Sequence, residues 1–244
     1  FGTASSNTRY GPRDDSLVVK LPAESKLSGK FTSNKLRAAP VSLAINNLSL
    51  TSKKNKILLI NAGNANAATG PNGLKDAQSY CSAIAKNVGV NKENVIPFST
   101  GVIGQSLPVK NYLEAFESAL NKIDSRNWKQ AASAILTTDT KPKIVSKEVK
   151  VGNTSYYVTG FAKGSGMIRP DFATLLSFVF IDANLSQSSL NKIHSTALSE
   201  SFETITVDGD TSPNDSSLLA TNGNSTKNIK KGSAAEKKVS KIII

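Results

Sequence analysis

The segment Lys163–Leu176 reads KGSGMIRPDFATLL. Two glycines interrupt regular structure, a proline stops any helix, and Thr174 opens an apolar run that reaches Ile181. Because glycine adopts backbone angles that other residues avoid, a strained or closely approached main chain is predicted here. A threonine in this setting suits a chain that cuts itself: its hydroxyl attacks the preceding carbonyl, and the new α-amine then serves as its base. The alternative is a plain glycine–serine–glycine loop that feeds a core strand.

The composition is that of an ordinary globular protein. With 244 residues, of which 39% are hydrophobic, the chain can bury a core as one large domain or two modest ones. None of its apolar runs reaches the roughly 20 residues that a membrane-spanning helix needs, so no membrane partner is expected. Residues 1–30 are predicted to be a variable or disordered lead-in, and residues 224–244 a lysine-rich tail of low complexity.

The formal charge of +12 raises the question of nucleic-acid binding. Lysines supply most of this charge and are scattered along the chain, with a denser cluster between Lys227 and Lys241. Nucleic-acid-binding surfaces more often gather arginines and interleave aromatic residues, and the chain has no zinc-finger spacing or RNA-binding aromatic motif. A lysine-rich solvated surface is therefore favoured, and no nucleic-acid partner is expected.

Strands and helices are predicted to alternate along the chain, with one hairpin around Gly152–Asn153. Ser186 is predicted to cap a helix that runs to Phe202. This mixture favours a layered α/β domain. The predicted elements are strands at Lys56–Asn61, Asn94–Phe98, Lys143–Val151, Thr154–Phe161 and from Thr174, helices at Gly73–Asn87 and Val109–Ile123, and a loop at Ser99–Leu107.

Several common chemistries do not fit the residues. His194, the single histidine, is predicted to lie on a helix surface, and no nucleophile elbow accompanies it. Cys81, the single cysteine, falls on an apolar helix face and is predicted to be a buried structural thiol, so zinc is not expected. The acidic run at Asp208–Asp215 departs from a calcium loop because Pro213 intrudes, and no dinucleotide or Walker motif is present. We therefore expect no metal and no bound cofactor.

Threonine chemistry remains, and it needs no histidine. A freed α-amino group has a pKa of roughly 7.7–8.0, so part of it can accept a proton near neutral pH. It belongs to the same residue as its hydroxyl, which can take an acyl group from one amine and pass it to another. A Thr-Gly pair can present a hydroxyl and a backbone N–H to the oxyanion, and Thr100–Gly101 is the best candidate. A simple turn is the alternative interpretation of that pair.

Five motifs, in order, resemble those of the ornithine acetyltransferases, the ArgJ family of arginine biosynthesis. Besides the opening segment they are Asn61–Gly70, Ser99–Gly104, Thr137–Lys143 and Val207–Ser212, which read NAGNANAATG, STGVIG, TTDTKPK and VDGDTS. The resemblance runs from about Phe31 to Gly223. It implies a layered α/β sandwich shared with the DmpA-type aminopeptidases, which is distinct from the doubly wound dinucleotide fold.

The resemblance also implies an activity and its residues. The precursor would cut itself at Ala173–Thr174, dividing the chain into an α region, residues 31–173, and the start of a β region, residues 174–223. Thr174 would be the nucleophile, Thr100 and Gly101 the oxyanion site, and Thr137, Lys163 and Thr174 the substrate-binding residues. The acetyl group would pass from N-acetylornithine to glutamate through an acetyl-threonine enzyme. Some members also use acetyl-CoA.

Three departures from the family pattern stand out. Asp171–Phe172 replaces the usual Asn-Met before the scissile bond, and Ala68 replaces a cysteine of the asparagine-rich loop. The family continues into an Asp-Gly-Glu-Gly-Ala motif that this chain does not contain, so a C-terminally truncated member is expected.

The resemblance further implies that the α and β pieces stay associated, as a heterotetramer or larger assembly. It places them in the cytoplasm, or in the mitochondrial matrix if the source is fungal. Two other classes stay open at this point. A self-processing N-terminal-nucleophile aminopeptidase or amidase would share the Thr174 chemistry, and a non-catalytic binding protein would share only the scaffold.

Overall fold

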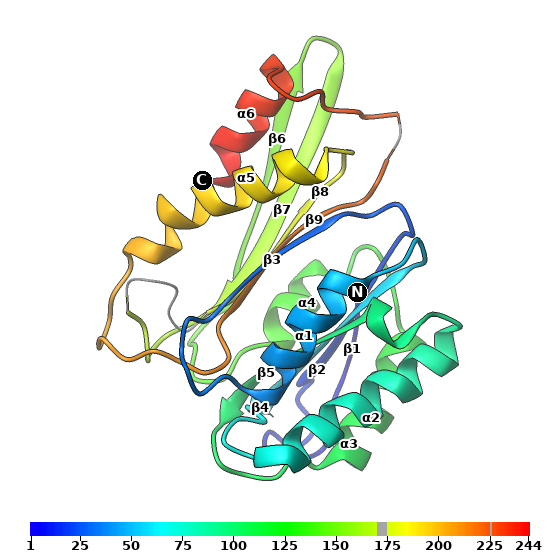
Figure 1. The fold of residues 1–244 in the computed structure, drawn as a ribbon, viewed down its shortest axis with the longest axis vertical. Coiled ribbons are helices and arrows are strands. Elements are labelled where there is room, and N and C mark those ends of the chain that lie inside the picture. The colour runs from blue at the N-terminus through cyan, green and yellow to red at the C-terminus, as the bar shows by residue number, and fades with distance from the viewer. Residues whose placement is uncertain (170–174, 225) are drawn as a thin grey trace.

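The computed structural model describes residues 1–169, 175–224 and 226–244 of the protein. Two β-sheets lie between layers of helices (Figure 1). In the first sheet, β1 pairs with β2 and β2 with β4 in antiparallel fashion, whereas β4 and β5 are parallel. Its strands, in sheet order, are β1 (Gly2–Ala4), β2 (Ser16–Leu21), β4 (Lys56–Asn64) and β5 (Val95–Val102).

The second sheet has five strands and one parallel pair, β8 and β9. Its other neighbours are antiparallel, so the prediction of a mixed sheet arrangement is confirmed. The strands, in sheet order, are β3 (Leu27–Phe31), β9 (Ser216–Thr221), β8 (Leu176–Ile181), β7 (Thr154–Lys163) and β6 (Lys143–Val151).

Helices cover the outer face of each sheet. In Figure 1, α2 and α3 lie beyond the first sheet and α5 and α6 beyond the second, while α1 and α4 lie at the margins of the space between them. None of the helices in the described ranges is both long and apolar enough to span a bilayer. The helices are α1 (Ala39–Leu50), α2 (Gly70–Val88), η1 (Lys92–Asn94), α3 (Val109–Leu120), α4 (Trp128–Ala134), α5 (Gln187–Ser199), η2 (Phe202–Thr204) and α6 (Ala234–Ile243).

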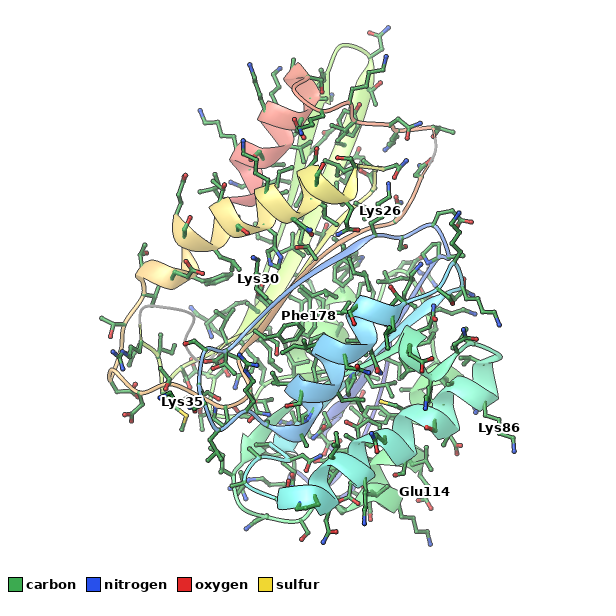
Figure 2. The ribbon with its side chains drawn as sticks, in the orientation of Figure 1. Lys26, Lys30, Lys35, Lys86, Glu114 and Phe178 are labelled. Carbon is green, nitrogen blue, oxygen red and sulfur yellow. The ribbon has the colours of Figure 1, made fainter. Side chains whose placement is uncertain are left out.

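The main core lies between the two sheets. On β4, Leu58 and Ile60 face this core, whereas Ile57 and Leu59 face α2 and α3. Both faces of the strand are buried, which is why its sequence is apolar without a polar alternation. An edge-to-face aromatic pair joins the sheets, with 5.1 Å between the ring centroids of Phe98 and Phe178. Figure 2 shows Phe178 in the interior, whereas Lys86 and Glu114 extend outward from α2 and α3.

Local signals in the sequence account for several boundaries. Val151 and Thr154 face each other across the β6–β7 hairpin, and Gly152 takes the positive φ of +59° that the turn requires. The Ser186 Oγ accepts a hydrogen bond from the Ser189 N–H at 3.1 Å, which caps α5. The hairpin and the Ser186 cap are confirmed, although α5 ends at Ser199 rather than at Phe202. The burial of Cys81 is confirmed as well, and it raises the thiol pKa well above its usual value.

The predicted disordered lead-in is ordered, and the lysine-rich tail contains a helix. Residues 1–30 are not a disordered lead-in: they contain β1, β2 and most of β3. Leu17 and Val19 of β2 bury their side chains between the sheets. This burial offsets the conformational entropy that the segment loses when it becomes ordered. The lysine-rich tail of residues 224–244 contains α6, whose Val239 packs against the outer face of the second sheet.

The strand β5 extends further than predicted. It was expected to end at Phe98, with a loop from Ser99, but it continues to Val102 beside an irregularity in β4 at Gly63 and Asn64. At Gly101, φ is +135°, and an added Cβ would come within 2.2 Å of the Gly63 carbonyl carbon. Only glycine fits this close approach of two backbones. The Thr100–Gly101 pair, for which a simple turn was the alternative, therefore lies near the end of a strand.

Candidate active site

Lys163 is the centre of a buried polar cluster. It is the last residue of β7, it is only 5% exposed, and its side chain crosses from the second sheet to the first. Its Nζ donates hydrogen bonds to the Thr100 Oγ1 of β5 at 3.0 Å and to the Thr137 Oγ1 at 2.9 Å. The structure thus joins three residues that the sequence assigned to one site from positions up to 63 residues apart.

Two carboxyl groups act on the Lys163 charge. Burial lowers the pKa of Lys163, while the charges of Asp139 and Asp215 act in the opposite direction and that of Lys143 adds to the lowering. Burial also raises the pKa of Asp139, but hydrogen bonds from the Lys143 ammonium and the Gly164 N–H, with the Lys163 charge, bring it below its ordinary value. The Lys163 ammonium therefore interacts electrostatically with one carboxyl group whose ionised form is favoured and with a second whose neutral form is favoured.

That second carboxyl group belongs to Asp215. The residue is 1% exposed, and burial raises its pKa to about 8 despite the opposing effect of the Lys163 charge. Its Oδ2 is buried without a hydrogen-bond partner among the described residues. Burial therefore favours the protonated, uncharged form of Asp215 near neutral pH, and the ionised fraction grows as the pH rises through about 8.

The loop after β7 is fastened to the acidic motif at Val207–Ser212. The Asp208 carboxylate accepts hydrogen bonds from the backbone N–H groups of Met167 at 2.5 Å and Ile168 at 2.8 Å. The Ile168 carbonyl in turn accepts from the Val207 N–H at 2.9 Å. The bonds from Met167 and Ile168 lower the pKa of Asp208, and all three bonds bring two of the sequence motifs to one side of the site.

The asparagine-rich loop supports the site through its side chains. The Asn61 Oδ1 accepts from the Ser99 Oγ at 2.5 Å, and the Asn64 Oδ1 accepts from the Asn66 N–H at 2.8 Å. The Asn66 Nδ2 donates to the Gly73 carbonyl at the start of α2, at 2.9 Å. These bonds fix the ends of β4 and β5, and through them the position of Thr100.

A cavity of about 420 Å³ opens beside this cluster. It brings together Thr100, Gly101, Thr137 and Lys163, four of the residues that the sequence assigned to the site. Most of the other lining residues belong to the motifs quoted from the sequence, but no role was assigned to them individually. Arg9 and Tyr10 lie in the expected disordered lead-in, and Asn214 follows the last motif. These further residues are Arg9, Tyr10, Val102, Ile103, Thr138, Ser165, Gly166, Met167, Asp208, Asp210, Ser212 and Asn214.

The predicted scissile pair, Ala173 and Thr174, lies outside the described residues. The described chain resumes at Leu175, whose carbonyl accepts a hydrogen bond from the Ser216 N–H at 3.0 Å. Leu176 is aligned with Lys163 on one side and with Ser216 on the other. The strand that follows Thr174 in the sequence therefore begins beside the strand that ends in Lys163.

His194 forms a second buried cluster, away from this cavity. It was predicted to lie on the surface but is 3% exposed, because it shares the buried face of α5 with Leu190 and Ala197. Its Nδ1 lies 3.0 Å from the Ser28 Oγ, and its Nε2 lies 2.9 Å from the Ser217 Oγ. Burial lowers the pKa of His194 to about 4, which keeps the ring neutral.

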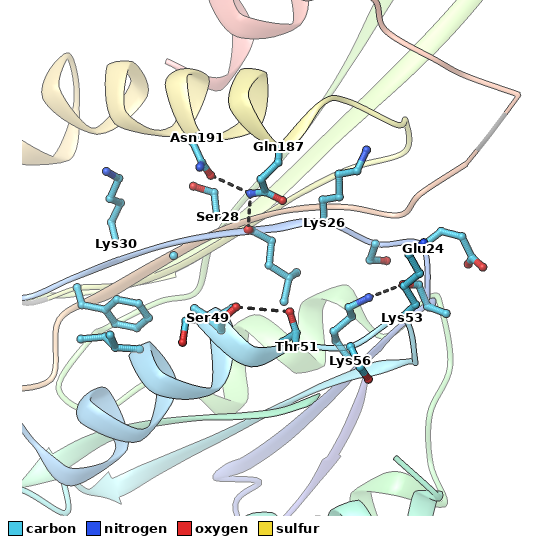
Figure 3. Close-up of a pocket in the computed structure, with 18 residues that line it drawn as sticks. Glu24, Lys26, Ser28, Lys30, Ser49, Thr51, Lys53, Lys56, Gln187 and Asn191 are labelled. Carbon is cyan, nitrogen blue, oxygen red and sulfur yellow. Dashed lines mark hydrogen bonds between the residues drawn. The ribbon is translucent and has the colours of Figure 1, made fainter. Parts of the chain in front are cut away.

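A larger cavity, about 880 Å³, lies between β3 and α1 (Figure 3). Several of its polar groups are already paired. The Gln187 Nε2 donates to the Leu27 carbonyl at 2.8 Å and to the Asn191 Oδ1 at 2.9 Å, and the Lys56 Nζ donates to the Ala23 carbonyl. The smaller cavity at Lys163 has the convergent chemistry and is the candidate active site.

Comparison with known families identifies the family of the chain. A sequence profile of the ArgJ family matches residues 1–243. The chain belongs to the ArgJ family. The arginine biosynthesis bifunctional protein ArgJ of Colwellia psychrerythraea is 42% identical over 235 residues, which are 92% of this chain and 55% of that protein. ArgJ of Methylococcus capsulatus is 42% identical over 219 residues, 90% of this chain and 53% of that protein.

This ArgJ-family chain spans about half the length of those curated relatives. Among solved structures, ArgJ of Bacillus halodurans is 28% identical, with a TM-score of 0.55 over 70% of this chain and 90% of that one. The ornithine acetyltransferase of Mycobacterium tuberculosis, complexed with ornithine, is 25% identical, with a TM-score of 0.56 over 71% and 90%. The layered α/β sandwich expected from the sequence is confirmed.

A β-aminopeptidase of Burkholderia sp. shares the fold alone. It is 12% identical, with a TM-score of 0.51 over 95% of this chain and 73% of that chain. The ArgJ architecture is therefore similar to that of an aminopeptidase, as the sequence analysis expected, although the sequences have diverged widely.

Proposed function

We propose that this chain carries the nucleophile half of an acetyltransferase of arginine biosynthesis, a glutamate N-acetyltransferase and ornithine acetyltransferase. The acetyl group moves from N-acetylornithine to glutamate, after self-cleavage at Ala173–Thr174. The observation that carries the proposal is the Lys163 ammonium, which is hydrogen-bonded to Thr100 and Thr137 at one cavity. Family membership supports the same reaction.

Each residue of the site has a separate role in the proposed reaction. The Thr174 hydroxyl attacks the acetyl carbonyl, and its own α-amine takes the hydroxyl proton. The Thr100 hydroxyl and the Gly101 N–H stabilise the oxyanion, and the proton returns to the departing ornithine nitrogen. The α-amine of glutamate then attacks the acetyl-threonine ester and releases the Thr174 hydroxyl. Lys163 and Thr137 hold the substrate carboxylate through a charge-assisted contact.

The partners follow from this reaction. N-acetylornithine and glutamate are the substrates, and acetyl-CoA is a further acetyl donor in members that make N-acetylglutamate directly. The two pieces, divided before Thr174, remain associated as a heterotetramer or larger assembly. The place of the reaction is the cytoplasm.

An intact-mass measurement after incubation with N-acetylornithine tests the proposal. The expected result is a mass increase of one acetyl group on the piece that begins at Thr174, which disappears when glutamate is added. An aminopeptidase of the same fold would release free acids by hydrolysis and transfer no acetyl group to glutamate. A chain that gains no acetyl group with either acetyl donor would contradict the proposed function.

A further inference from the structure

Asn214 is held rigidly at the wall of the candidate active site. It lies two residues before β9, and it is 5% exposed. Its N–H donates to the Ser212 Oγ at 3.1 Å, and its carbonyl accepts from the Ser216 Oγ at 2.9 Å. The backbone on both sides of its side chain is therefore fixed.

The side-chain amide is fixed as well. Its Nδ2 donates to the Ala65 carbonyl at 2.7 Å and to the Ser99 carbonyl at 3.0 Å. Two carbonyl oxygens require the nitrogen at this position, so the amide has one orientation and cannot exchange its oxygen and nitrogen. Because the amide is planar, the direction of the Oδ1 is then set.

The Oδ1 has no hydrogen-bond partner among the described residues, although it is buried. The three asparagines of the neighbouring loop differ in this respect. The Oδ1 atoms of Asn61, Asn64 and Asn66 accept from the Ser99 Oγ, the Asn66 N–H and the Thr69 Oγ1. A buried hydrogen-bond acceptor without a donor costs free energy. The Asn214 Oδ1 is therefore suited to accept a hydrogen bond from a bound molecule.

The cavity that Asn214 lines is also lined by Lys163, whose ammonium suits a carboxylate. We propose that Asn214 is a specificity-determining residue, whose Oδ1 accepts a hydrogen bond from the α-amide N–H of an N-acylated amino acid. This inference rests on the proposed function. An acceptor and a cation in one cavity match the N–H and the carboxylate that such a molecule carries on the same carbon. They select an N-acyl amino acid over an ester or a simple amide.

The test compares N-acetyl-L-ornithine with its analogue methylated on the α-amide nitrogen, which lacks only that N–H donor. Calorimetry with the wild-type protein should show the analogue binding at least about 10-fold more weakly, since the acceptor is then buried unpaired. In Asn214→Ser the two affinities should become similar. In Asn61→Ser, where a paired scaffold asparagine is lost, the discrimination should persist.

Equal affinities for the two ligands in the wild-type protein would overturn the inference, whether or not the Asn214 variant folds. An undiminished preference for N-acetyl-L-ornithine in a folded Asn214→Ser would also overturn it. Either result would leave the proposed function intact, because acetyl transfer to Thr174 is measured separately. Failure of both ligands to bind, with no acetyl-enzyme formed, would reject the proposed function and this inference together.

Discussion

Two buried side chains can each carry a positive charge, and their surroundings differ. Burial lowers the pKa of both Lys163 and His194. Lys163 has the carboxyl groups of Asp139 and Asp215 nearby and borders a cavity. The ring nitrogens of His194 lie within hydrogen-bond distance of two serine hydroxyls, and the charge of Lys30 disfavours its protonated form.

This difference separates a site from a structural core. The neighbouring carboxyl groups favour the charged form of the Lys163 side chain although this side chain is buried. A buried positive charge is useful where an anionic substrate must bind. The surroundings of His194 keep a neutral ring between β3 and β9, where it joins the two strands to α5. A buried titratable side chain is therefore a candidate for function only when its neighbours supply opposite charge and an opening.

The largest expected effect is on activity. Lys163→Met should lower kcat/KM for N-acetylornithine about 10- to 100-fold, since a charged hydrogen bond of about 1.5–3 kcal/mol is lost. The melting temperature should change little, because removal of a buried charge offsets the lost contacts. Lys147→Met, at an exposed position on β6, is the matched control and should leave both quantities unchanged. A folded Lys163→Met with wild-type kinetics would remove Lys163 from the site.

The reverse pattern is expected at His194. His194→Leu leaves the Ser28 hydroxyl unpaired and removes a bond to Ser217, so stability should fall by about 2–3 kcal/mol. Kinetics of the variant that remains folded should match those of the wild type. Denaturant unfolding with a parallel activity assay checks this, and a loss of activity comparable to that of Lys163→Met would erase the contrast between the two clusters.

The pH dependence of stability sharpens the same contrast. The unfolded chain protonates His194 below about pH 6.5, whereas the folded chain does so only near pH 4. The unfolded state thus binds more protons in this window, so the contribution of His194 is complete above pH 6.5 and is lost as the pH falls toward 4. In His194→Leu, the free energy of unfolding should fall less steeply as the pH drops from 6.5 to 4. An unchanged slope would contradict the proposed effect of burial on His194.

Asp215 should show a pH dependence of stability with the opposite sign. Its pKa is about 8 in the folded chain and 3.8 ordinarily, so the folded state binds more protons between these values. Its contribution to stability therefore declines as the pH rises through this window. Asp215→Asn should match the wild type near pH 4 and be the more stable protein above pH 8, as measured by thermal unfolding. A variant less stable than the wild type at high pH would show that the carboxylate is stabilised by its surroundings.

Local signals in the sequence predicted the fold better than the site. The β6–β7 hairpin and the Ser186 cap depend on a few adjacent residues, and both were found. The extension of β5 through Gly101 depends on a close contact with Gly63, and the burial of His194 depends on β3 and β9. Such contacts join distant segments and leave no local pattern. The roles of Lys163 and Thr137 came from the family resemblance, because neither residue is distinctive in its own segment.

Sequencing the N-terminus of the smaller piece of the mature protein tests the central claim most directly. We expect this piece to start at Thr174, because the Thr174 hydroxyl attacks the Ala173 carbonyl and water resolves the ester. Thr174→Val keeps the β-branch and the volume without the hydroxyl, and it should remain one folded chain. A start at any other residue, or cleavage that survives in the valine variant, would contradict the account.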